Sequence, residues 1–277
     1  MYLKVLIVML LVSISARAID KHCDSFINNR LEDLKPHIGY IAGKMSINKE
    51  YDPNKDPSVL SSNYTTQDKT YLTLCSILSS GDKERLSKYL AHNNFDKNCY
   101  DNLYMYCDTS LEKKIRTPAD IDLKWSAYAA TGDVKYVELL IDNLNEWLMQ
   151  SQILTSDLQY GTIVMHHYDY KSSNAITMMK AAIKKYSQED KVRFFMSQMA
   201  LWSLGSISKN DSKVHAAAFL HAQKKEYADL VALLQTAYFS SLCQPPIGMS
   251  TSKSLMVLPG EKHKFKKING DNFLNQF

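Results

Sequence analysis

The apolar residues from Ala119 to Leu148 recur at helical spacing in two consecutive segments. One face of the first segment carries Ile121, Trp125, Tyr128 and Ala129, and one face of the second carries Val137, Leu140, Ile141, Leu144 and Leu148. Between them, Gly132 can take the left-handed conformation that ends a helix, and Asp133 can cap the next helix. Two apolar stripes joined by so short a turn predict an antiparallel helical hairpin.

A second segment, Leu72–Leu90, repeats this pattern 51 residues earlier, with Gly81-Asp82 in the place of Gly132-Asp133. The apolar positions stay in phase: Leu74 matches Trp125, Ile77 matches Tyr128, Leu86 matches Val137 and Leu90 matches Ile141. A weaker third copy has its turn at Asn210-Asp211, with a slip of one residue. The repetition predicts stacked hairpins. The alternative is that short helices reuse such turns by chance.

Helical periodicity continues to Leu242, and no convincing strand pattern appears in the second half of the chain. The sequence therefore predicts an all-α fold over residues 19–243, an irregular stack of antiparallel helical hairpins in a TPR-like array. Residues 46–66 concentrate Pro, Asn, Asp and Ser and predict a long loop, and Leu34-Lys35-Pro36 predicts a break between two short helices ahead of it. Two prolines at 245–246 end the helical region, so residues 244–277 are predicted to be a less regular tail.

Residues 1–18 have the organisation of a secretory signal peptide. The basic start ends at Lys4, an apolar run follows from Val5 to Ile14, and Ala16-Arg17-Ala18 has the small residues of a cleavage site. The apolar run is shorter than the ~20 residues that a membrane-spanning helix needs, which disfavours the alternative of an uncleaved anchor. The sequence predicts export to the periplasm or secretion.

The charge of the chain gives no sign of a nucleic-acid partner. The formal net charge is +4, and removal of Lys4 and Arg17 with the signal peptide leaves about +2. No second apolar stretch approaches membrane-spanning length, so the mature chain is predicted to be soluble and without a membrane span. The tail 244–277 is more basic than the rest. It is either a docking segment for an acidic partner or membrane, or a solvated terminus.

The chain has five cysteines, an odd number that cannot pair completely. Cys99 and Cys107 flank a short segment and are the predicted disulfide in an oxidising compartment. The alternative is that several cysteines are simply buried thiols. No CxxC pair is present, so zinc binding is not favoured.

Candidate catalytic chemistry is sparse. His166-His167-Tyr168-Asp169 brings two imidazoles and a carboxylate together, but adjacent helical residues point about 100° apart, so a buried or surface histidine pair is favoured over a metal site. Asp120 and Asp122 are expected on different sides of their helix and give no acid and base pair. HExxH, GxSxG and glycine-rich phosphate loops are lacking. The sequence predicts no catalytic, cofactor-binding or metal-binding residue.

The chain has seventeen tyrosines. Aromatic residues at helical spacing are usually core residues, but the concave side of a helical stack can also display them as binding anchors. The residues proposed as partner-binding aromatics are Tyr104, Tyr106, Tyr128 and Tyr136.

The segment WSAYAATGDVKYVELLIDNL, residues 125–144, and the run Ala200–Ser203 resemble exported bacterial proteins built from TPR-like helical hairpins. The 51-residue offset departs from the TPR period of 34. The resemblance implies a helical-repeat scaffold of the bacterial cell envelope or a secreted factor, with a protein partner, no cofactor and no catalytic residue to carry over. An exported hydrolase with an unrecognised active site is the alternative.

Protein isolated from the exported fraction should begin at Ile19, because signal peptidase would cut after Ala18. Intact-mass spectrometry and N-terminal peptide mapping measure this directly. Recovery of the full-length chain from the cytoplasm alone would contradict the prediction.

Overall fold

The computed structural model describes residues 21–56, 64–107, 111, 114–167 and 173–243, without the side chains of residues 173–176. This part of the chain forms twelve α-helices and one 3-10 helix, with no strand, so the predicted all-α fold is confirmed. The elements are α2 (Lys21–Asn29), α3 (Leu31–Ile47), η1 (Pro53–Lys55), α5 (Thr66–Ser80), α6 (Lys83–His92), α7 (Lys97–Cys107), α8 (Pro118–Thr131), α9 (Lys135–Met149), α10 (Thr155–His167), α11 (Ser173–Ile183), α12 (Gln188–Ser208), α13 (Ser212–Lys224) and α14 (Ala228–Leu242). The predicted signal peptide and tail lie outside the described residues.

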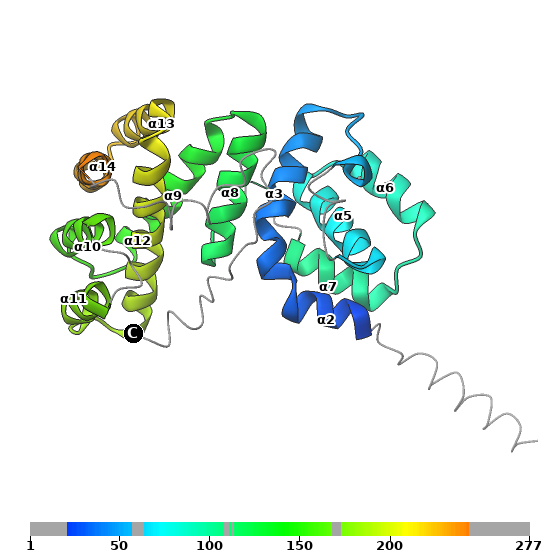
Figure 1. Ribbon diagram of the computed structural model, residues 1–277, viewed down its shortest axis with the longest axis horizontal. Helices are drawn as coiled ribbons and strands as arrows, with labels where there is room; N and C mark the ends of the chain where they lie inside the picture. The colour runs from blue at the N-terminus through cyan, green and yellow to red at the C-terminus, as the bar shows by residue number, and fades with distance from the viewer. Residues whose placement is uncertain (1–20, 57–63, 108–110, 112–113, 168–172, 244–277) are drawn as a thin grey trace, which may run out of the picture.

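Helix α3 lies at the centre of the N-terminal half, between α5 and α8, and its contact with α8 is the most extensive between any two helices described (Figure 1). Gly39 and Gly43 lie one turn apart on the face that meets α8. A Cβ atom on Gly39 would lie 2.3 Å from the carbonyl oxygen of Leu123, and one on Gly43 would lie 3.0 Å from the Cβ of Ala130. The two helix backbones can approach this closely because these two positions have no side chain.

A buried ion pair also joins α3 to α8, near the N-terminal end of each helix. Lys35 Nζ lies 2.9 Å from an Asp120 carboxylate oxygen and 2.7 Å from Glu32. Burial lowers the pKa of Lys35, but the two carboxylates outweigh it and raise that pKa. Burial likewise raises the pKa of Asp120, but Lys35 and hydrogen bonds from the backbone N–H groups of Arg116 and Thr117 outweigh it and lower that pKa. One carboxylate therefore both caps α8 and docks it on α3.

The predicted hairpins are present as α5–α6 and α8–α9. Gly81 and Gly132 end α5 and α8 at positive φ, 72° and 69°, as predicted. The aspartate after each glycine accepts a hydrogen bond from a backbone N–H in the first turn of the next helix. The weaker third copy is also a hairpin, α12–α13, and Asp211 caps its second helix through the N–H of Lys213.

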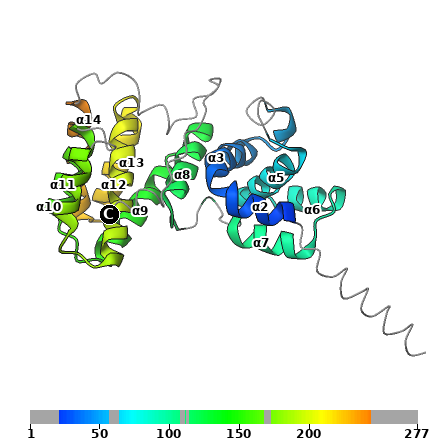
Figure 2. The ribbon, with the colours of Figure 1, turned by 60° about the horizontal axis from the view of Figure 1, so that its bottom comes forward.

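The first two copies do not stack directly on each other. Helices α5 and α8 lie on opposite sides of α3 (Figures 1 and 2). Helix α6 packs mainly on α5 and has no fully buried residue, so Leu86 and Leu90 are only half-buried. Their counterparts Val137 and Ile141 are fully buried because α12 and α13 pack on α9. The periodicity therefore predicted the inner face of each hairpin but not the helix that covers it.

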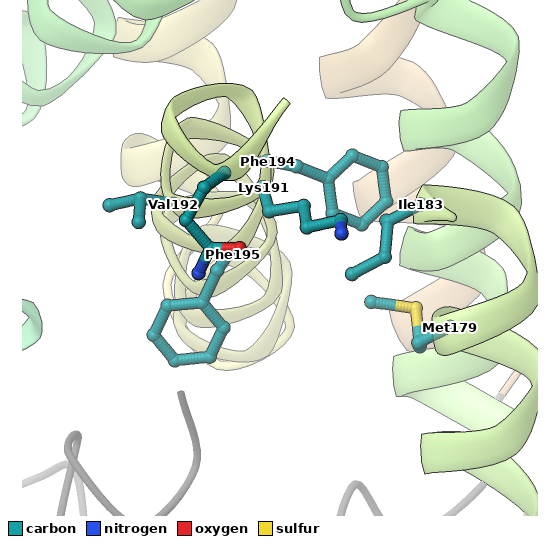
Figure 3. Close-up of a pocket in the computed structure, with 7 residues that line it drawn as sticks. Met179, Ile183, Lys191, Val192, Phe194 and Phe195 are labelled. Atoms are coloured by element: carbon teal, nitrogen blue, oxygen red, sulfur yellow. The ribbon is translucent and has the colours of Figure 1, made fainter. Parts of the chain in front are cut away.

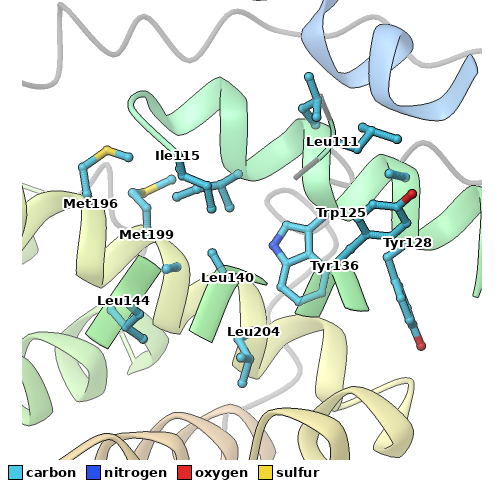
Figure 4. Packing of buried hydrophobic residues seen from close by; sticks show 14 of the residues in the cluster. Leu111, Ile115, Trp125, Tyr128, Tyr136, Leu140, Leu144, Met196, Met199 and Leu204 are labelled. Carbon is cyan, nitrogen blue, oxygen red and sulfur yellow. The ribbon is translucent and has the colours of Figure 1, made fainter. Parts of the chain in front are cut away.

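Helix α12, with 21 residues, supports the C-terminal half. Helices α10, α13 and α14 pack against it, and α14 lies between α10 and α13 although it is the last of the described helices (Figure 1). The side chain of Trp125 fills the space between α8 and α12, where its indole N–H donates to Ser203 Oγ at 2.9 Å (Figure 4). Tyr128 donates to Asp211 at 2.6 Å, so the hairpins α8–α9 and α12–α13 are in direct contact.

The break predicted at Pro36 is wrong. Pro36 lies inside α3, and the chain breaks at Arg30, between α2 and α3. A proline inside a helix removes one backbone hydrogen bond. Helix α3 buries eleven of its seventeen residues, and this packing offsets the lost bond.

The predicted loop 46–66 is slightly shorter in the structure, since α3 continues to Ile47 and α5 begins at Thr66. Residues 57–63 of this loop lie outside the described residues. The guanidinium of Arg85 donates to the carbonyl oxygens of Asn48, Lys49 and Tyr51, which fixes the start of the loop against α6. None of the described helices is both long and apolar enough to cross a membrane.

Gly39→Ala should lower the free energy of unfolding by about 2 to 3 kcal/mol, because the new methyl group would overlap backbone atoms of Leu123. On an exposed helix, the same change stabilises by about 1 kcal/mol. Gly43→Ala is the matched control and should cost less, since its Cβ would lie 3.0 Å from the Ala130 Cβ and 3.2 Å from the Ala127 carbonyl oxygen, whereas that of Gly39 would lie 2.3 Å from a carbonyl oxygen. Urea unfolding of both variants measures the difference. A neutral or stabilising Gly39→Ala would contradict the close approach of α3 and α8.

Candidate interaction surface

Helix α7 is attached to its neighbours by two disulfides. Cys99 is bonded to Cys23 of α2, and Cys107 is bonded to Cys75 of α5. The predicted Cys99–Cys107 bridge is wrong, because both residues lie on one helix and their Cα atoms are about 12 Å apart along its axis. A disulfide joins Cα atoms only about 4 to 7 Å apart. The fifth cysteine, Cys243, is exposed and free.

The buried face of α7 consists of Cys99, Leu103 and Cys107, which recur every four residues. The helix begins where the Asp96 carboxylate accepts hydrogen bonds from two backbone N–H groups of its first turn. At the other end, Ser79 Oγ of α5 donates to the Cys107 carbonyl oxygen at 2.9 Å. Both ends of α7 are thus held against the α2–α5 layer.

The opposite side of α7 presents large side chains to solvent. Tyr104, Met105 and Tyr106 are 45%, 65% and 48% exposed. At 3.6 residues per turn, Tyr104 and Tyr106 lie about 200° apart around the outer side, with Met105 between them. The three side chains therefore spread around the outer half of the helix, with Met105 pointing outward and a tyrosine on each side of it, and we call this exposed set the α7 ridge. The Tyr104 ring is also 6.1 Å from that of Tyr100, measured between ring centroids.

The other two proposed binding aromatics are core residues. Tyr128 and Tyr136 are 8% and 2% exposed, and both belong to the buried hydrophobic cluster (Figure 4). Burial, followed by the nearby Asp211 carboxylate, raises the pKa of Tyr128. Neither tyrosine is available to a partner. Only Tyr104 and Tyr106 of the four remain candidates.

The two histidines of the HHYD segment point in different directions, as expected from their helical spacing. His166 is fully buried and His167 is exposed, while Tyr168 and Asp169 lie outside the described residues. The His166 ring packs against Gly205 of α12, where a Cβ atom would lie 2.8 Å from Nε2. Burial, and to a lesser extent the nearby His167 and Lys209, lowers the pKa of His166 to about 4. The ring is a neutral core group at neutral pH.

Asp120 and Asp122 face different sides of α8, as predicted. Asp120 is held in the ion pair with Lys35. One carboxyl oxygen of Asp122 is buried and accepts no hydrogen bond from any described residue, and burial alone raises the pKa of this carboxyl to about 8. Burial, and not a charged neighbour, therefore accounts for the raised pKa of Asp122.

His221 belongs to a polar contact that the sequence analysis missed. Its Nε2 lies 2.8 Å from Asp142 of α9 and its Nδ1 lies 3.8 Å from Glu138, while the Tyr227 hydroxyl donates to the same Asp142 oxygen at 3.2 Å. Both ring nitrogens face carboxylates, so neither is available to a substrate. The cluster fastens α13 to α9. His221 and Asp142 are 79 residues apart, and no local pattern links them.

The described part of the chain contains no group of three His, Cys, Asp or Glu side chains that could hold a metal ion. Comparison with protein-family models, curated proteins and solved structures finds no match for the chain.

The contribution of His166 to the stability of the protein should fall between pH 6.5 and pH 4, while Asp122, with its raised pKa, contributes in the opposite direction over the same range. The pKa of His166 is about 4 in the folded protein and ~6.5 when unperturbed, so in this range the unfolded chain binds a proton that the folded protein does not. This group should contribute up to about 3 kcal/mol, fully present above pH ~6.5 and lost as the pH falls toward 4.

Urea unfolding at several pH values tests this for the wild type, His166→Gln and the control His167→Gln. Relative to the wild type, His166→Gln should lose the part of the pH dependence that lowers the unfolding free energy below pH 6.5, whatever its effect at pH 7. His167→Gln should keep the wild-type dependence. An unchanged dependence in His166→Gln would show that His166 is not a buried neutral group.

Proposed function

We propose that this protein is an exported helical scaffold that inserts the α7 ridge into a concave surface of a protein partner. One observation carries the proposal: α7 is bound covalently at both ends of one face and displays Tyr104, Met105 and Tyr106 on the other. The partner is a protein with an apolar groove, because such a groove accommodates a convex helical ridge.

The rigidity of α7 favours binding. A binding helix loses little conformational freedom on association when it is already fixed in place, so more of the contact energy appears as affinity. Tyrosine and methionine are enriched at protein interfaces, and tyrosine is frequent among the residues whose truncation weakens binding most. The only ion pair within α7, Lys97 with Asp101 at 2.6 Å, is exposed and self-contained. Recognition is therefore mainly apolar and aromatic.

Export to the periplasm or secretion agrees with this arrangement. The signal-peptide pattern of residues 1–18 and the two disulfides support the same compartment, since disulfides persist where the environment is oxidising. Reduction would release both covalent attachments of α7, so the ridge would be held firmly only outside the cytoplasm.

We propose that the TPR-like arrangement is limited to the hairpins α8–α9 and α12–α13, and the contacts between their helices support this. In the N-terminal half, α3 lies between α5 and α8, so the hairpin α5–α6 does not stack directly on the hairpin α8–α9. We infer a short helical array extended by an N-terminal module that carries the α7 ridge. The hydrolase alternative has no comparable support, because His166 is enclosed in the core and His221 is engaged by carboxylates.

The α7 ridge can be tested with a photo-crosslinking residue, p-benzoylphenylalanine, in place of Met105 in the full chain produced by its native cells. Irradiation should join the protein to one discrete partner. Adding Tyr104→Ala and Tyr106→Ala should lower the crosslink yield at least about tenfold, because truncating an interface tyrosine commonly costs more than 1 kcal/mol.

The matched control is Tyr160→Ala, which removes a tyrosine of similar exposure, 40%, from α10. This change should leave the yield unaltered, and circular dichroism should show wild-type folding for all variants because the tyrosines are exposed. Treatment with dithiothreitol before irradiation should also lower the yield. A wild-type crosslink that persists in the double tyrosine variant, or no crosslink at all, would contradict the proposal.

A further inference from the structure

The hollow between α11 and α12 is too small for a ligand. Met179, Ile183, Phe194 and Phe195 line a cavity of about 20 Å³ (Figure 3). Such a cavity holds about one water molecule. The accessible apolar side chains of the C-terminal half lie instead on its outer surface.

Four aromatic rings and a leucine lie together on the surface of α13 and α14, away from α7 (Figures 1 and 2). The His215 ring stacks on the Tyr238 ring, with 4.1 Å between their centroids, and it lies 5.8 Å from the Phe219 ring. The Phe239 ring follows at 5.6 Å from that of Tyr238. Phe239 is 61% exposed, and Leu242, one turn further along α14, is 45% exposed. We call these five side chains the α14 face.

The side chains of the α14 face are uncharged. The chain has no Asp, Glu, Lys or Arg between Asp229 and Cys243 in α14, and none between Lys213 and Lys224 in α13. Burial lowers the pKa of His215, so this ring is neutral at neutral pH. A neutral apolar surface can face an identical surface without repulsion between like charges. The α14 face is therefore compatible with a second copy of itself.

The thiol of Cys243 lies at the edge of the same face. The Cys243 N–H donates to the Phe239 carbonyl oxygen, so helical geometry continues to Cys243, which places it one turn from Phe239 and beside Leu242. The other four cysteines are paired with each other, whereas Cys243 is exposed and free. An odd cysteine in an exported protein indicates a bond between two chains. In a two-fold interface the same residue of both copies can meet near the axis, so one thiol per chain is sufficient.

We propose that the α14 face binds a second copy of this chain in a two-fold dimer, closed by a disulfide between the two Cys243 residues. The two thiols release two protons and two electrons as the bond forms, and a disulfide oxidant of the compartment takes them up and becomes two thiols. This oxidation rests on the export proposed above, whereas the contact between the two faces does not. Because the α14 face lies away from α7, the α7 ridges of both copies stay accessible.

The disulfide supplies stability that the face alone lacks. A stable non-covalent dimer buries about 800 Å² per partner, which is more than five partly exposed side chains supply. A covalent bond between the copies holds the two faces at a high effective concentration, so a small contact is sufficient.

Exchange with glutathione tests the dimer in the mature protein. One oxidised glutathione and two Cys243 thiols give the covalent dimer and two reduced glutathione molecules. One oxidised glutathione and one Cys243 thiol give instead a monomer that carries glutathione, with one reduced glutathione molecule released. In excess glutathione the dimer should still be the main product, because contact between the faces favours it. Non-reducing electrophoresis and intact-mass spectrometry measure the ratio of the two products. The glutathione-bearing monomer as the main product would overturn the proposal.

Variants of the face separate a specific contact from a merely accessible thiol. Phe239→Ser combined with Leu242→Ser should lower the ratio of dimer to glutathione-bearing monomer at least about tenfold, as truncation of central interface residues commonly does. Met149→Ser is the control, since it removes an exposed apolar side chain from α9 and should leave the ratio unchanged. Circular dichroism should show wild-type folding for both, because these side chains are exposed. An unchanged ratio in the double variant, or an equal loss in Met149→Ser, would contradict the proposal.

The residues that follow Cys243 in the chain are the competing occupant of the α14 face. A monomer whose Cys243 reacts with neither glutathione nor iodoacetamide would show that the face is covered within one chain, and would overturn the proposal. The α7 ridge is not part of this contact, so the Tyr104→Ala and Tyr106→Ala variant should form the dimer like the wild type. Loss of the dimer and loss of the partner crosslink are therefore distinguishable.

Discussion

The close contact between α3 and α8 is the constraint on which the rest of the structure depends. On one side of it, α3 holds α2 and α5, which carry the cysteines that fix α7. On the other, α8 contacts α12 through Trp125 and Ser203. A buried ion pair is favourable only when its geometry is fixed, because two charges have lost their hydration. The Lys35–Asp120 pair and the Gly39 and Gly43 approach therefore stabilise each other, and together they connect the two halves of the molecule.

The local part of the fold could be predicted from the sequence because its causes are local. Gly81 and Gly132 required a left-handed conformation, the aspartate after each could cap the next helix, and the apolar stripes marked the buried faces. The neighbour of each hairpin could not be predicted, since an apolar stripe does not specify what covers it. One sequence signal was overlooked. Gly39 and Gly43 lie four residues apart within GYIAG, and small residues at this spacing allow close helix packing.

The candidate site was predictable in part. Tyr104, Tyr106, Tyr128 and Tyr136 could not be separated by periodicity, because their exposure depends on helices distant in the sequence. A local clue existed for the first two: Cys99, Leu103 and Cys107 recur every four residues and define a buried face that places Met105 outward. The predicted Cys99–Cys107 disulfide implied a closed loop at this segment, and a loop has no such buried helical face. A helix with cysteines spaced in this way more readily forms disulfides with other helices than with itself.

Several polar side chains that lie between helices have a common structural role. His221 with Asp142, Trp125 with Ser203, and Gln198 with the Leu158 carbonyl oxygen each join two helices from different hairpins. Apolar stripes of similar width can pack in several pairings, whereas a buried polar group left without a partner costs about 1 to 3 kcal/mol. Each of these bonds therefore disfavours an incorrect helix neighbour. In an all-helical chain whose turns resemble one another, polar contacts of this kind select one packing among the several that the hydrophobic pattern allows.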